Sequence, residues 1–83
     1  MVIFMRLDKF LKVSRIIKRR TVANEACDAG RVEVNGKIAR ASYDVKVGDK
    51  IIVSLGQNSR AFEVLEINEH VLKEDASKMY KVL

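Results

Sequence analysis

The stretch RLDKFLKVSRIIKRRTVANEACDAGRVEVNG, residues 6–36, decides the fold. It contains two segments of helical periodicity, followed by an alternating segment that ends in Asn35-Gly36. An asparagine-glycine pair is the strongest short-range hairpin signal, because both residues tolerate the positive φ of a type I′ turn. The sequence therefore predicts a helix pair that leads directly into antiparallel strands.

Residues 7–17 are predicted to form an amphipathic helix. At about 100° per residue, Leu7, Phe10 and Leu11 fall on one side of it. Asp8 lies in the first turn, where a carboxylate complements the positive end of the helix dipole or forms a local salt bridge with Arg6 or Lys12. The side opposite the apolar residues carries basic groups spaced by three: Lys9, Lys12 and Arg15.

A second helix is predicted to begin at Arg20 or Thr21 and to end near Ala29. Gly30 follows at the position where a left-handed C-terminal cap is needed, a conformation that glycine adopts without strain. Cys27 falls on the apolar face of this helix, so we interpret it as a small core residue rather than a reactive thiol.

The rest of the chain is predicted to form strands and turns, with one further helix. Strands are expected over residues 31–34, 37–41, 50–55 and 60–67, with turns at 46–49 and 56–59. The last of these strands offers the core four residues: Ala61, Phe62, Val64 and Ile67. Residues 73–83 have weaker helical spacing and are predicted to form a short C-terminal helix on the sheet. Its apolar face carries Ala76, Met79, Tyr80 and Leu83.

All of the excess positive charge of the chain lies in its first quarter. The sequence has 16 basic and 11 acidic residues, a net charge of +5. Residues 1–20 carry seven basic groups and one acid, whereas the remainder carries nine basic and ten acidic groups. Such segregation is typical of a surface that binds a phosphate backbone, and a solvated basic helix without a partner is the alternative. Phe10, the one aromatic residue of the basic stretch, lies on the apolar face, which argues against recognition of single strands by base stacking.

Composition limits the class of protein further. A chain of 83 residues with 48% apolar content makes one globular domain with a thin core. No apolar run approaches the roughly 20 residues that span a bilayer, so we expect no membrane association. A single cysteine excludes an internal disulfide and fits a reducing cytoplasm, the localisation that we expect. The patterned sequence begins at Arg6, so Met5 is an alternative start to Met1.

Residues with catalytic or metal chemistry are not grouped in the sequence. His70, the single histidine, has no serine or cysteine partner motif, and we interpret it as a surface residue. No CxxC, HxxxH, GxGxxG or P-loop pattern occurs, and a chain of this size leaves little room for a substrate cavity. We therefore expect no catalytic residue, no metal, no cofactor and no enzymatic activity.

Four motifs in sequence order resemble the S-four RNA-binding domain. They are RLDKFL at residues 6–11, Arg20 with Ala23, GRVEVNG at residues 30–36 and VKVGDKI at residues 45–51. None is decisive alone, but their order and spacing together are specific. The resemblance covers residues 6–53, and we expect residues 1–83 to form a single domain of this type.

The resemblance implies an α+β fold of α-L architecture, in which two N-terminal helices pack on a small twisted antiparallel sheet. It also implies that the helix pair and its loop present basic side chains to structured RNA. Arg6, Lys9 and Arg20 match positions that contact RNA in this family. Four more basic residues enlarge this surface, and with those three they are called the basic patch below: Lys12, Arg15, Lys18 and Arg19.

The sequence departs from the family pattern at two positions. Many members have a glycine in the interhelical loop and a serine before the arginine that opens the second helix, whereas this chain has Arg15 and Arg19 there. Loss of the serine cap should cost about 1 kcal/mol. The basic residue gained in the loop is expected to strengthen the phosphate contact.

Among stand-alone members of the family, the start of this chain is most similar to the short RqcP-type proteins, relatives of the fifteen-kilodalton bacterial heat-shock protein. That group binds the free large ribosomal subunit that still carries peptidyl-tRNA, in ribosome-associated quality control of stalled nascent chains. The resemblance thus implies large-subunit ribosomal RNA and tRNA as partners, with a tailing factor on the same subunit as a further one. We expect the chain itself to be a monomer.

Other interpretations remain open at this point. A stand-alone RNA-binding module would also fit a role in ribosome assembly or RNA processing. A fragment of an enzyme, such as a pseudouridine synthase or a methyltransferase, is disfavoured because the patterned C-terminal segment indicates a complete chain. A protein-interaction module would need an exposed apolar patch, which the sequence does not indicate.

We predict that RNA binding weakens steeply with ionic strength, because each phosphate that the basic patch neutralises releases condensed counterions. In filter binding to a structured RNA, the association constant should fall about tenfold or more between about 50 mM and about 200 mM potassium chloride. Affinity that stays constant over this range would contradict a phosphate-binding surface.

Overall fold

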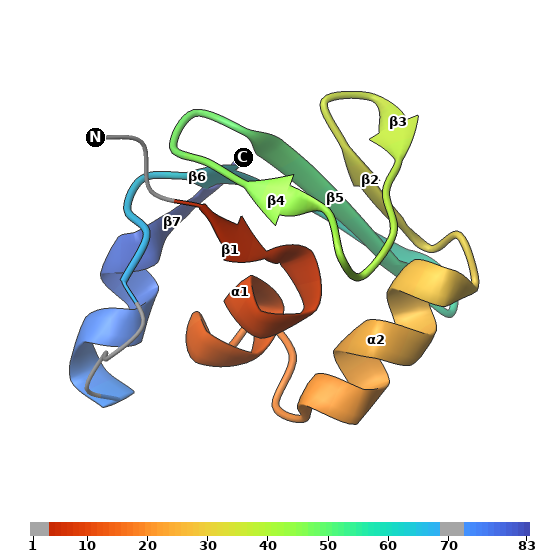
Figure 1. Cartoon of the computed structure of the whole chain (residues 1–83), viewed down its shortest axis with the longest axis horizontal. Helices are drawn as coiled ribbons and strands as arrows, with labels where there is room; N and C mark the ends of the chain where they lie inside the picture. The colour runs from red at the N-terminus through yellow and green to blue at the C-terminus, as the bar shows by residue number, and fades with distance from the viewer. Residues whose placement is uncertain (1–3, 69–72) are drawn as a thin grey trace.

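The computed structural model describes residues 4–68 and 73–83, which form two α-helices and two antiparallel sheets. The larger sheet has the strand order β3-β2-β5-β6-β7, and β1 pairs with β4 in the smaller one. Figure 1 shows both α-helices on the same side of the larger sheet, with β1 and β4 next to α1. The predicted α+β architecture is therefore confirmed. The helices are α1 (Leu7–Val13), α2 (Arg20–Asp28) and the 3₁₀ helix η1 (Lys73–Met79), and the strands are β1 (Met5–Arg6), β2 (Val32–Val34), β3 (Lys37–Ile38), β4 (Asp44–Val45), β5 (Lys50–Leu55), β6 (Asn58–Val64) and β7 (Tyr80–Val82).

The first turn of α1 is held by a segment that lies more than thirty residues later in the chain. The amide of Leu7 donates to the carbonyl of Tyr43 at 2.8 Å, and the amide of Asp8 donates to that of Ala41 at 3.2 Å. The amide of Lys9 donates to Oδ1 of Asp8 at 2.8 Å. These bonds satisfy three of the four amides that a helix leaves without intrahelical partners at its N-terminus. The start of α1 is thus fixed by two tertiary bonds and by the side chain of Asp8, whereas its N-cap residue, Arg6, makes no capping bond.

The helix α1 is shorter than predicted, since it ends at Val13 and not at Ile17. Arg15 has a φ of +64°, and its amide donates to the carbonyl of Lys12 at 3.1 Å. This left-handed conformation at a helix end favours glycine, because a β-carbon makes it unfavourable. The chain then turns back so that Ile17 is buried in the core, with its amide bonded to the carbonyl of Leu11 at 3.0 Å.

The helix α2 confirms its predicted bounds to within one residue. Its N-cap residue, Arg19, has φ −117° and ψ 132°, and its side chain makes no capping hydrogen bond. Gly30 ends the helix with a φ of +74°, as predicted. The amide of Gly30 donates to the carbonyl of Cys27 and that of Arg31 to Ala26, both at 3.0 Å, which is the Schellman arrangement.

Two turn motifs that are distant in the sequence are joined by side chains. Asn35 and Gly36 have φ values of +53° and +84° and form the predicted turn between β2 and β3. The buried carboxylate of Asp49 accepts hydrogen bonds from Nδ2 of Asn35 and from the amide of Lys46, both at 3.1 Å. The amide of Lys50 donates to Oδ1 of Asn35 at 3.0 Å. The hairpin and the turn before β5 therefore form one hydrogen-bonded unit.

The core lies between the helix pair and the larger sheet. Its helical part consists of the predicted residues Leu7, Phe10 and Leu11 together with Ala23, Ala26 and Cys27. Burial, and then the negative charges of Asp8 and Asp28, raise the pKa of the Cys27 thiol to about 11. This confirms the interpretation of Cys27 as an unreactive core residue. The sheet contributes alternating residues of three strands: Val32, Val34, Ile51, Val53, Phe62 and Val64.

The C-terminal prediction was wrong in part. Residues 73–79 are helical, as a 3₁₀ helix, but the chain continues as β7 and pairs antiparallel with β6. Leu83, predicted to lie on a buried helix face, is exposed. Tyrosine and valine favour strands, and β6 offers an edge with which they can pair. Ala76 and Met79 are buried as expected, and Tyr80 is partly buried.

Several strand bounds also differ from the predictions. The strands predicted at residues 37–41 and 60–67 end early, at Ile38 and Val64, and β6 begins already at Asn58, inside the predicted turn. Ala61 is only partly buried, whereas Ile67 packs against the core from beyond the end of β6. His70 lies outside the described residues.

We predict that Arg19→Ser stabilises the protein by about 1 kcal/mol, because a serine hydroxyl at the N-cap accepts a hydrogen bond from an amide of the first turn. In a domain of this size the melting temperature should rise by about 4–8 °C. Lys18→Ser is the matched control, since it removes the same charge one residue earlier without creating a cap. Equal melting temperatures for the two variants in calorimetry would contradict the N-cap assignment.

Candidate nucleic-acid interface

The centre of the basic patch is a buried carboxylate. Asp8 is 1% exposed, although it carries a charge. Its Oδ1 atom accepts a hydrogen bond from Nε of Arg6 at 3.2 Å. Its Oδ2 atom accepts one from Nε of Arg20 and one from Nδ2 of Asn24, both at 3.3 Å. Asp8 therefore connects β1, α1 and α2 through side-chain contacts.

The surroundings of Asp8 keep it ionised. Burial raises the pKa of the Asp8 carboxyl, but hydrogen bonds from Asn24, Arg20 and the Lys9 amide, together with the charge of Arg20, outweigh burial and leave that pKa below its usual value. An ionised carboxylate away from water is strongly unfavourable without such donors. The fold therefore favours the arrangement in which these donors stay bonded to Asp8.

The two arginines contact Asp8 in a way that leaves about half of each side chain exposed. Arg20 uses Nε for its ion pair, and Arg6 uses Nε for the shorter of its two contacts, while its Nη2 atom lies 3.5 Å from Oδ2. The side chains of Arg6 and Arg20 remain 50% and 48% exposed. A guanidinium group that presents its Nη atoms matches the geometry of a phosphate group. Asp8 thus orients two arginines at the surface in a form suited to phosphate binding.

The structure brings together the three residues that the family pattern matched to RNA contact. Arg6 and Arg20 meet at Asp8 by their side chains, and Lys9 meets it by its backbone amide. The other members of the basic patch lie on the end of α1, on the interhelical loop and at the N-cap of α2. All four are exposed: Lys12, Arg15, Lys18 and Arg19.

Sequence reasoning missed Asn24 and understated Asp8. The salt bridge of Asp8 with Arg6 is confirmed, but the contacts of Asp8 with Arg20 and Asn24 were not predicted. A signal was present, because Arg20 and Asn24 are four residues apart and therefore share one face of α2. A polar pair on a helix that packs against another helix indicates a buried partner.

Other chemistry is not supported at this surface. Within residues 4–68 and 73–83, no three histidine, cysteine, aspartate or glutamate side chains are grouped so that they would hold a metal ion. Ser14 is buried, and its hydroxyl donates to the carbonyl of Leu11 at 3.4 Å, which is a structural contact. In the described part of the chain, no helix has the length and apolar character needed to cross a membrane.

Known proteins match the chain over most of its length. The family model of the S4 domain matches residues 5–51. The RQC P-site tRNA stabilizing factor of Halalkalibacterium halodurans is 53% identical over 78 residues, which are 94% of this chain and 89% of that protein. The protein of the same name from Bacillus subtilis is 53% identical over 79 residues, covering 95% and 92%. Heat shock protein 15 of Vibrio cholerae, described as trimeric, has a similar structure, with a TM-score of 0.88 and 27% identity over 98% of this chain and 83% of that one.

We predict that Asp8→Asn lowers the free energy of unfolding by about 2–4 kcal/mol at pH 7, because it removes the buried charge that accepts the hydrogen bonds of Arg6, Arg20 and Asn24. The folded-state pKa of Asp8 lies below the ordinary value of 3.8. Its contribution is therefore complete above that value and is lost as the pH falls through the folded-state pKa. In urea unfolding, wild type and variant should differ at neutral pH and converge as the pH is lowered below about 4.

Asp44→Asn is the matched control, because Asp44 is an exposed aspartate on β4. Its unfolding free energy should stay within about 0.5 kcal/mol of wild type at neutral pH. A difference between wild type and Asp8→Asn that is the same at pH 7 and at pH 3 would show that ionisation of Asp8 does not stabilise the fold.

Proposed function

Because the chain belongs to the S4 domain family, we propose that it is a non-enzymatic RNA-binding factor of ribosome-associated quality control that binds the large ribosomal subunit and its peptidyl-tRNA. The observation that carries this proposal is the pair of surface arginines that Asp8 orients. The proposal is also supported by 53% identity, over nearly the whole chain, to two proteins named as P-site tRNA stabilizing factors.

The basic patch suits a role in stabilising tRNA by contact with its backbone. Structured RNA is recognised mainly through its shape and its phosphates, which are the groups that oriented arginines bind well. The ion pairs with Asp8 restrict Arg6 and Arg20 before RNA arrives, so less side-chain entropy is lost on binding. The exposed members on the loop extend the same charge beyond the two arginines.

The proposal includes large-subunit ribosomal RNA as the second partner. A factor that holds tRNA on the ribosome must contact both molecules, and two linked contacts raise the effective concentration of each for the other. We assign these contacts to the seven residues of the basic patch. A tailing factor on the same subunit is a further proposed partner, and the bacterial cytoplasm, where ribosomes work, is the proposed location.

The proposed functional unit is a single domain that includes residues beyond the family match. The S4 domain model ends at residue 51, inside β5. However, β6 pairs with the whole length of β5, and β7 pairs with β6. The last two strands therefore complete the sheet on which the helix pair packs, and we treat residues 1–83 as one domain.

We predict that Arg20→Ala weakens binding to tRNA by about tenfold or more, because it removes a charged and oriented side chain that binds phosphate. Lys37→Ala removes a positive charge on β3, outside the basic patch, and should change the affinity less than about twofold. Filter binding of wild type and both variants to the same tRNA measures the difference. Equal affinities for Arg20→Ala and Lys37→Ala would contradict the assignment of the patch.

The same three proteins, tagged and expressed in bacteria, test the ribosomal role by sedimentation of lysate through a sucrose gradient. Wild type and Lys37→Ala should migrate with the large subunit in fractions that contain tRNA, and Arg20→Ala should move towards the top. Wild-type protein at the top of a low-salt gradient would overturn the proposal. Co-migration mainly with precursors of the subunit would replace it by a role in ribosome assembly.

A further inference from the structure

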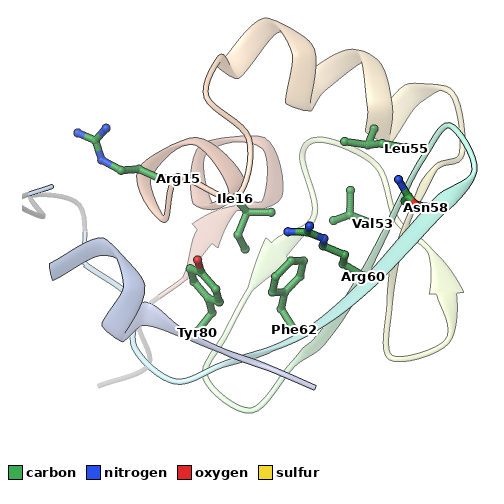
Figure 2. A pocket seen from close by; sticks show the side chains of 8 residues that line it. All are labelled: Arg15, Ile16, Val53, Leu55, Asn58, Arg60, Phe62 and Tyr80. Carbon is green, nitrogen blue, oxygen red and sulfur yellow. The ribbon is translucent and has the colours of Figure 1, made fainter. Parts of the chain in front are cut away.

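A cavity of about 300 Å³ lies next to the basic patch, between the interhelical loop and the larger sheet. Figure 2 shows the side chains that line it. The loop contributes Arg15 and Ile16, and the three strands β5, β6 and β7 contribute residues from the face that the helices cover elsewhere. The strand residues used in the argument are Val53, Arg60, Phe62 and Tyr80.

Arg60 occupies an unusual position for a charged residue. On β6 it alternates with Phe62 and Val64, which are buried, and its cross-strand partner on β5 is the buried Val53. It therefore projects from the core face of the sheet, at an end where it remains exposed. Figure 2 shows its side chain reaching into the cavity between Val53 and Phe62. On this face of β6 the buried Phe62 and Val64 are thus followed by two exposed polar residues that line the cavity, Arg60 and Asn58.

Arg15 stands at the rim of the same cavity. Its guanidinium group points outward, away from the floor (Figure 2). Its backbone has a φ of +64°, which glycine would adopt more easily. The chain thus keeps a cation, in an unfavourable backbone conformation, where the basic patch meets the cavity.

The lining suits a flat group with apolar faces and a polar edge. Val53 and Phe62 form an apolar floor and are each 5% exposed, and the ring of Tyr80 stands at 90° to that of Phe62 with centroids 5.2 Å apart. Among the described residues around the cavity, two are arginines and none is acidic. Unpaired bases stack on arginine planes and aromatic rings and use hydrogen-bond donors along their edges. The volume lies at the lower limit for ligand pockets, which is enough for one base but not for a helix.

We propose that this cavity receives one unpaired nucleotide of the bound RNA, with its base against Arg60 and the apolar floor and its phosphate at Arg15. The proposal rests on the proposed function in that Arg15 belongs to the basic patch. It adds a contact with a base to a surface whose other contacts are with phosphates, which position RNA without reading it. The basic stretch itself lacks an accessible aromatic residue, but Phe62 and Tyr80 line the cavity at whose rim Arg15 stands.

An apolar side chain of a protein is the alternative occupant. The two arginines favour RNA, because an apolar side chain would remove Arg60 from water without offering it a partner. Continuity with the basic patch also favours RNA, since a strand held at the patch would pass the rim of the cavity.

The test uses two RNA hairpins that are identical except for a single bulged 2-aminopurine in the stem of one of them. Wild-type protein should bind the bulged hairpin about tenfold more tightly than the fully paired one, with a change in 2-aminopurine fluorescence. Arg60→Leu should bind both hairpins with the affinity that wild type has for the paired one. Arg40→Leu, which alters an exposed arginine outside the cavity and the patch, should retain the tenfold preference.

A second variant, Tyr80→Phe, removes only a hydroxyl group and preserves the ring packing against Phe62. It should reduce the preference for the bulged hairpin while the affinity for the paired hairpin is unchanged. Melting temperatures establish that each variant is folded at the temperature of the assay.

Equal wild-type affinity for the two hairpins would overturn the proposal and leave the proposed function intact, because both RNAs are still bound. An equal loss of affinity for both hairpins in Arg60→Leu would also overturn it, since Arg60 would then be one more phosphate contact. Unchanged RNA binding by Arg60→Leu, with loss of co-sedimentation with the large subunit, would assign the cavity to a protein instead. Failure of wild type to bind either RNA would overturn both proposals.

Discussion

One buried ionic contact determines both the packing and the chemistry of this domain. Asp8 is removed from water, so its charge is tolerated only while donors from β1, α1 and α2 surround it. The same donors include the two arginines that face solvent. The contacts of Asp8 that join the two helices therefore also position the two arginines. A substitution of Asp8, Arg6 or Arg20 therefore changes both the stability of the fold and the surface of the basic patch.

The structure separates what local sequence can specify from what it cannot. The helix end at Gly30 was predicted correctly because few residues other than glycine adopt its backbone conformation, so the prediction does not depend on distant residues. The contacts of Asp8 with Arg20 and Asn24 join residues 12 and 16 positions apart, so the spacing of Arg20 and Asn24 on one face of α2 indicates a shared partner but does not identify it as Asp8. The prediction of a helix at residues 80–82 was wrong for a similar reason, since these residues form a strand only because β6 offers an edge for pairing. The seven residues of the basic patch were identified by charge and family position, and their contacts with RNA stay predictions.

The interhelical loop combines charge with poor local geometry. Arg15 adopts a left-handed conformation that costs an arginine about 1 kcal/mol or more, and Arg19 occupies an N-cap without capping it. The fold would be more stable with the glycine and the serine that many family members have at these two positions. A domain of this size has limited stability to lose. The loop therefore has positive charge at two positions where small residues would stabilise the backbone more, at the point where the two helices, the basic patch and the cavity meet.

The way in which α1 begins has a consequence for synthesis of the protein. The first two amides of the helix bond to carbonyl groups of Tyr43 and Ala41, and β1 pairs with β4. Although the basic residues are made first, the arrangement around Asp8 is not complete until the chain has been extended beyond residue 45 and that segment has left the exit tunnel. The nascent chain thus emerges with its charge exposed but its arginines unoriented.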